Sequence, residues 1–133
     1  MDGITVKSIS EIAPYGGPNA IVGIRFRPAR QALGVTSWGM SVMELDPHCT
    51  GYPEHDHATE GHEEVYLVFR GSVVLRSGGV ERTLHEGDFV RVSPDTTRKF
   101  VTREEGATLL ALGGTPGAPY SPAMGRPSGA AAR

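Results

Sequence analysis

The feature that most constrains the fold of this chain is its division into short apolar or alternating segments, each ended by glycine, proline or a polar turn. No segment keeps a sustained helical period. Many short strands at close spacing are typical of an antiparallel sandwich or barrel. We therefore predict an all-β fold, with strands over residues 21–26, 35–45, 65–76, 80–84, 89–92, 98–102 and 108–112.

Local signals refine this pattern. Residues 4–9 alternate weakly and are predicted as a first, edge strand, whereas 28–34 is predicted as a loop or a single helical turn. The segment 65–76 is expected to be two strands bent at Gly71-Ser72, and Ser77-Gly78-Gly79 is a hairpin signal that returns the chain onto 80–84.

Length and charge limit the classes of function. The chain has 133 residues and a net charge of −2, which predicts one domain over residues 1–120 and a Gly/Pro/Ala-rich, flexible tail over 121–133. No Lys/Arg cluster is present, so neither nucleic acid nor an anionic membrane is expected as a partner. No signal peptide or membrane-spanning run is recognisable, and the single cysteine fits a reducing compartment, so we expect a cytoplasmic protein.

Residues 52–71 carry the chemistry. Three of the five histidines, His55, His57 and His62, fall within eight residues, and Glu64 follows at the head of an apolar strand. Side chains two apart on a strand share a face, so His55 and His57 form one row, and His62, Glu64 and Tyr66 a second. Imidazoles beside a carboxylate are ligands that a divalent first-row metal prefers. These residues are therefore candidate metal ligands.

Two motifs resemble those of the cupins. His-x-His, a glutamate, six residues and a glycine (Glu64 to Gly71) are similar to the first cupin motif, with two extra residues between His57 and Glu64. The stretch Gly87 to Arg98 is similar to the second motif, but it carries Arg98 where most cupins have a third histidine ligand. The resemblance is to small single-domain bacterial cupins. It implies an antiparallel double-stranded β-helix, or jelly-roll barrel, whose mouth holds the ligand row.

Arg98 and His62 leave alternatives open. Arginine stays protonated and has no acceptor, so Arg98 cannot be a metal ligand. If it points inward, it either pairs with Glu64 or clamps a substrate carboxylate; if the register differs by one, Lys99 points inward instead. A direct Arg98–Glu64 pair would argue against a metal. His62 either supplies the missing nitrogen or belongs to the loop made by the two-residue extension.

The sequence offers simpler interpretations of the other candidate residues. Tyr66 orients a ligand, acts as an acid or is a packed core aromatic, and Trp38 is core or lumen wall. Glu63, one residue off in register, is expected to point outward. His48 and His85 lie in predicted turns and are expected to be exposed.

Three functional hypotheses follow. The first is a metal-dependent cupin, in which His55, His57, Glu64 and His62 hold a divalent ion (Fe, Mn, Ni, Zn or Co), Glu64, Tyr66 and Arg98 act on a small anionic ligand, and the reaction is of isomerase, lyase or dioxygenase type. The second is a metal-free binding or sensor module, and the third a metal-free acid–base isomerase or cyclase. Whether the chain is an enzyme, which substrate it takes and which metal it binds do not follow from the sequence.

Edge strands predict a homodimer.

Overall fold

The computed structural model of the chain describes residues 2–117. Its elements within that range are η1 (Ile9–Glu11), β1 (Ile24–Arg27), α1 (Ala29–Leu33), β2 (Gly39–Leu45), β3 (Glu63–Ser77), β4 (Val80–His85), β5 (Phe89–Val92), β6 (Lys99–Val101) and β7 (Ala107–Gly114). The predicted all-β class is confirmed. The tail predicted over 121–133 lies outside the described residues.

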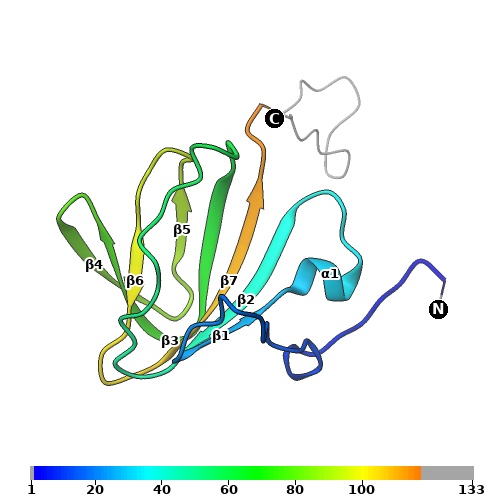
Figure 1. Cartoon of the computed structure of the whole chain (residues 1–133), viewed down its shortest axis with the longest axis horizontal. Coiled ribbons are helices and arrows are strands. Elements are labelled where there is room, and N and C mark those ends of the chain that lie inside the picture. Colours follow the sequence, from blue (N-terminus) through cyan, green and yellow to red (C-terminus); the bar gives the residue numbers. More distant parts are fainter. Residues whose placement is uncertain (1, 118–133) are drawn as a thin grey trace, which may run out of the picture.

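Strand β3 is the centre of the fold, and all of the strand pairs are antiparallel. Its first half pairs with β7 and β5, and its second half pairs with β4 and β6. β7 continues to β2 and then to β1. Figure 1 shows the result: β3 and β7 lie in the middle, with β1 and β2 on one side and β4 and β6 on the other. One long strand therefore belongs to two sheets, which face each other across the core.

The change of partner occurs where the sequence predicted a bend. Gly71 is the last β3 residue opposite β7, and Ser72 is the first opposite β4. The strand is nevertheless continuous, rather than two strands. Gly71 has φ +75°, and a Cβ at this position would lie 1.9 Å from the backbone oxygen of Gly106. Only glycine allows both this dihedral angle and this close approach of the two backbones.

The core lies between the two sheets. It contains Tyr66 and Val68 from the first half of β3, Val73 from the second half, Phe100 from β6 and Leu109 from β7. Phe100 and Leu109 are fully buried. Tyr66 and Val68 share a face because strand side chains alternate, so the inward row that begins at Glu64 continues into the core.

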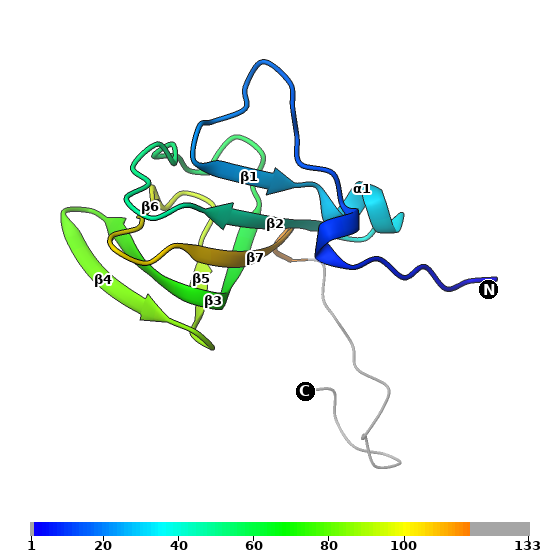
Figure 2. The ribbon, with the colours of Figure 1, turned by 90° about the horizontal axis from the view of Figure 1, so that it is seen from below.

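Three predicted segments differ from the structure. Residues 4–9 form no strand: residues 2–8 are exposed and run away from the barrel (Figures 1 and 2), and Ser8 N–H donates to Glu11 Oε1 at 2.9 Å as the chain turns into η1. β1 begins only at Ile24, because the chain turns at Gly23 with φ +87°. β2 begins at Gly39 rather than at residue 35. The single helical turn is α1, and no helix among residues 2–117 has the length and apolar character needed to cross a bilayer.

Candidate functional site

The candidate site is a pocket of about 850 Å³ in the mouth of the barrel. Its lining comes from β1, α1, β2, β3 and β7 and from the loops that precede β1, β2 and β3. A polar cluster, which we define as Tyr52, His55, His57, Glu64 and Tyr66, forms one part of the lining. A second part, the apolar lining, consists of Ile21, Ile24, Phe26, Trp38, Met40 and Met43.

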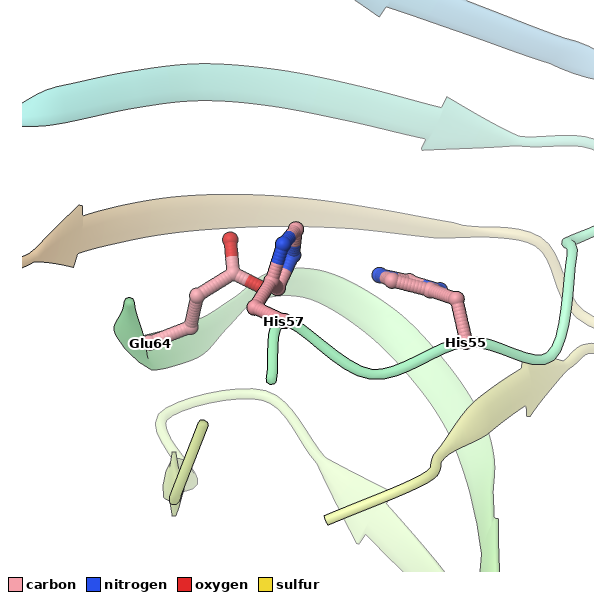
Figure 3. Close-up of side chains that lie close together, drawn as sticks. All are labelled: His55, His57 and Glu64. Atoms are coloured by element: carbon pink, nitrogen blue, oxygen red, sulfur yellow. The ribbon is translucent and has the colours of Figure 1, made fainter. Parts of the chain in front are cut away.

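Three members of the polar cluster lie close enough to share one ion. One donor atom each from His55, His57 and Glu64 fall within 4.8 Å of one another, the one such group found among the described residues. The two histidines project from the loop before β3, and Glu64 lies at the start of β3 (Figure 3). His57 Nε2 lies 3.0 Å from Glu64 Oε1. The structure thus brings three of the four predicted ligands together.

Arg98 decides the electrostatics of this cluster. Its side chain is completely buried, and Nη2 donates to Glu64 Oε1, whose own side chain is 18% exposed. Nη1 donates to the backbone oxygen of Thr96 at 3.0 Å. Arg98 also pairs through its backbone with His55, with N···O distances of 2.9 and 3.1 Å. One residue therefore holds both the loop that carries His55 and the carboxylate of Glu64.

Tyr66 completes the arrangement around Glu64. Its hydroxyl donates to Glu64 Oε1 at 2.6 Å and lies 3.4 Å from the Tyr52 hydroxyl. Burial, and then the neighbouring Tyr52 and the bond to Glu64, raise the pKa of Tyr66 far above its usual value. Burial likewise raises the pKa of Tyr52 to about 12. Both hydroxyls therefore stay protonated at neutral pH, and the Tyr66 hydroxyl remains a donor to Glu64 Oε1.

The guanidinium stays charged in this setting. Burial alone would lower the pKa of Arg98, but the hydrogen bond to Tyr66 and the nearby charge of Glu64 outweigh it and raise the pKa. Arg98 and Glu64 therefore form a buried pair of opposite charges, to which Tyr66 adds a neutral donor.

The two histidines present different atoms to the pocket. His55 Nδ1 lies 2.8 Å from the backbone oxygen of Pro53, which can only accept, so Nδ1 carries the proton and Nε2 is left with its lone pair. His57 Nε2 faces the Glu64 carboxylate, so this contact is a hydrogen bond only when Nε2 carries a proton. In this arrangement His55 Nε2 can accept a hydrogen bond, and His57 Nε2 donates to Glu64 when it carries a proton.

The remaining candidates fall outside this cluster. His62 lines the pocket but is exposed, with its ring centroid 6.3 Å from that of His57. Arg98 points inward, but it is not among the residues that line the pocket, and Lys99 instead bonds to the Thr50 carbonyl. Glu63 pairs with Arg91 on the exposed side.

Sequence reasoning missed two contributors, Tyr52 and the Thr96 carbonyl. A single aromatic residue before the histidines forms no periodic pattern in the sequence. A backbone oxygen has no sequence signal, because every residue has one.

A divalent metal is the ion that this donor set implies. The donor types fit, and so does the Nδ1 contact of His55, because a carbonyl on the far nitrogen commonly orients a ligating imidazole. The charges do not fit: Glu64 Oε1 already accepts from Arg98 and Tyr66. A dication about 4 Å from a guanidinium is repelled by about 8 kcal/mol at an effective dielectric near 20. While Arg98 holds Glu64, the cluster does not suit a metal ion.

Comparison with known proteins agrees with the geometry of the barrel. A family model described as a cupin domain matches residues 41–112. No curated protein matches the sequence. A cupin protein from Bacteroides fragilis superposes with a TM-score of 0.72 and 21% identity, covering 93% of this chain and 94% of that one. At this identity the likeness concerns the fold alone, and it confirms the predicted jelly roll.

Two other solved structures have activities in their names. A sugar phosphate isomerase of the cupin superfamily from Silicibacter pomeroyi is 25% identical, with a TM-score of 0.62, over 69% of this chain and 59% of that chain. This chain thus covers less than two thirds of that protein. The polyketide cyclase RemF from Streptomyces resistomycificus superposes with a TM-score of 0.68 at 15% identity, over 83% of this chain and 78% of that one.

Proposed function

The chain belongs to the cupin family, and from this premise we propose that it binds a small organic molecule in the barrel mouth and moves a proton on that molecule without a metal ion. This is the metal-free acid–base hypothesis, now preferred over the metal-dependent one. The observation that carries the proposal is the buried Arg98–Glu64 pair. A fixed positive charge already neutralises the carboxylate that a metal would need.

The polar cluster can handle a proton. His55 Nε2 presents a lone pair, and the ring centroids of His55 and His57 are 5.0 Å apart. His55 accepts a proton from an acidic C–H or O–H of the ligand, and the imidazolium so formed returns that proton to another ligand atom, while Glu64 holds His57 beside it. Such a transfer changes no oxidation state and needs no co-reactant, so an isomerisation or a cyclisation is the class of reaction that it serves.

A general base in a pocket can be tested without knowing the substrate. In 5-nitrobenzisoxazole, a base takes the ring C–H proton, the N–O bond breaks, and its electron pair stays on oxygen as a coloured phenolate. We expect the protein to accelerate this ring opening beyond free imidazole at the same concentration, and His55→Gln to remove most of the acceleration. His85→Gln is the matched control, because His85 is exposed on β4 and lies outside the pocket. Equal rates for wild type and His55→Gln would refute the proposal.

A divalent metal centre is the second candidate. The observation in its favour is the spacing of His55, His57 and Glu64, all within 4.8 Å. These three residues would hold the ion, which would supply an electrophile in the pocket, and Arg98 would have to give up part of its contact with Glu64. Ring opening that disappears on dialysis against EDTA and returns with Mn²⁺ or Zn²⁺ would favour this candidate.

The chain is also proposed to be a homodimer. Residues 2–8 are exposed and extend from the barrel, with Ile4 57% and Val6 74% accessible (Figure 2). A segment that leaves its own barrel with two exposed apolar side chains is suited to cover a second copy, because a jelly roll leaves unpaired strand edges. Sedimentation velocity at micromolar concentration tests this, and a monomer alone would contradict it.

A further inference from the structure

The apolar lining of the pocket is larger than a proton-transfer site requires. The pocket holds about 850 Å³, within the range of sites for drug-sized molecules. A short acid or a single sugar would leave most of that lining wet. The apolar lining therefore indicates the size and polarity of the ligand, which the polar cluster alone does not.

Aromatic residues of the pocket, from the apolar lining and beside it, are exposed. Tyr15 is 43%, Phe26 42% and Trp38 51% accessible, and all three line the pocket. Their faces are water-exposed as the structure stands, and a flat apolar molecule would cover them. Met40, two residues after Trp38 in the chain, also lines the pocket, and its unbranched thioether side chain can adapt to the shape of a ring. The described lining thus favours a ring system.

The charges argue in the same direction. Among the described lining residues, the fixed charges are those of Arg30 and Glu64. Glu64 is neutralised by Arg98, which lies behind the lining. A phosphate group usually needs several cations or a bidentate arginine fork, and the described lining supplies a single arginine, Arg30, which lies outside the polar cluster. A sugar phosphate is therefore a poorer match for this pocket than an uncharged ring system.

We infer that the natural ligand is a flat, largely apolar aromatic or polycyclic molecule with one acidic hydroxyl or enolisable carbonyl, its ring system against Phe26 and Trp38 and its oxygen at His55 and His57. This inference rests on the proposed function and names its substrate class. It also gives Trp38 the role of a binding residue.

The single tryptophan makes binding directly measurable. Trp38 is the one tryptophan of the chain, so its fluorescence reports on the pocket. We expect 2-naphthol to quench this fluorescence at micromolar concentration, and calorimetry to give an affinity at least about tenfold above that for glucose 6-phosphate. Tighter binding of glucose 6-phosphate would overturn the inference.

Two variants locate the binding. Trp38→Ala, followed by calorimetry, is expected to weaken 2-naphthol binding by about tenfold or more, the loss of one aromatic contact. Phe89→Ala is the control, because Phe89 is 71% exposed on β5 and lies outside the pocket lining. An unchanged affinity in Trp38→Ala, or an equal loss in Phe89→Ala, would contradict the inference.

The ring-opening assay separates this inference from the proposed function. His55→Gln is expected to weaken 2-naphthol binding by no more than the loss of one hydrogen bond, up to about tenfold, while it removes the rate acceleration. If 2-naphthol binds as predicted but His55→Gln retains full activity, the proton-transfer proposal fails and the ligand class stands. If 2-naphthol does not bind, the ligand class fails whatever the rates are.

Discussion

Replacing Arg98 by methionine tests the buried ion pair most sharply. Methionine keeps an unbranched apolar chain but removes the charge, and it leaves Glu64 with the Tyr66 hydroxyl and His57 as donors. Removing one partner of a buried pair destabilises by about 3–5 kcal/mol. Because Glu64 is 18% exposed and keeps those donors, we expect the lower end, about 3 kcal/mol. For a chain of 133 residues this lowers Tm by about 10 °C.

The matched control is the ion pair of Glu63, the residue that precedes Glu64 in β3. Arg91→Met breaks the Arg91–Glu63 pair, whose side chains are 63% and 38% exposed, and an exposed pair contributes at most about 1 kcal/mol. Urea unfolding of both variants measures the difference in free energy. The double variant Arg98→Met/Glu64→Gln should be more stable than the sum of the single effects predicts, because neither charge is then left alone. A loss below about 1 kcal/mol in Arg98→Met, equal to that in Arg91→Met, would refute the reasoning.

Three further predictions concern the rest of the fold. Gly71→Ala should prevent folding or destabilise by several kcal/mol, whereas Gly87→Ala, also at positive φ but with nothing within 4 Å, should cost only about 1 kcal/mol; thermal melts compare them. Arg27 and Arg25 outweigh burial and lower the pKa of Glu44, so its contribution is present above the usual pKa of 4.5 and is lost as the pH falls through the lowered value. The Tm difference between wild type and Glu44→Gln should therefore shrink at acid pH, and a constant difference would contradict the assignment. Deleting residues 2–8 should give monomers by sedimentation; persistent dimers would exclude that segment as the cover.

Much of the fold and part of the site followed from local sequence patterns. The run from Glu64 to Val68 alternates inward and outward, so the positions of Glu64 and Tyr66 could be predicted from strand periodicity alone. His55 and His57 lie close to Glu64 in the sequence, so a short loop suffices to bring them together. The bend at Gly71 was predictable because glycine marks a close backbone approach.

The rest depended on contacts between distant segments. Whether Arg98 or Lys99 points inward depends on the pairing of residue 98 with His55, across 42 residues of intervening chain. The edge strand predicted over residues 4–9 failed because alternation alone does not supply a partner, and Ser8 and Glu11 instead begin a helical turn. His62 was assigned to the row of Glu64 by extending β3 backward, but the strand begins only at Glu63.

The proposed function depends on Arg98 taking the place of a metal ion. The measurement that tests this most directly is the metal content of the wild-type protein and of Arg98→His. Both proteins are purified without an affinity tag or chelator and dialysed against equal concentrations of Mn²⁺, Ni²⁺ and Zn²⁺. An imidazole at this position would remove the fixed charge and add a neutral ligand beside His55, His57 and Glu64. We expect wild type to hold well under one ion per chain and Arg98→His to approach one. One ion per chain in wild type, with no gain in Arg98→His, would show that Arg98 does not replace a metal ion.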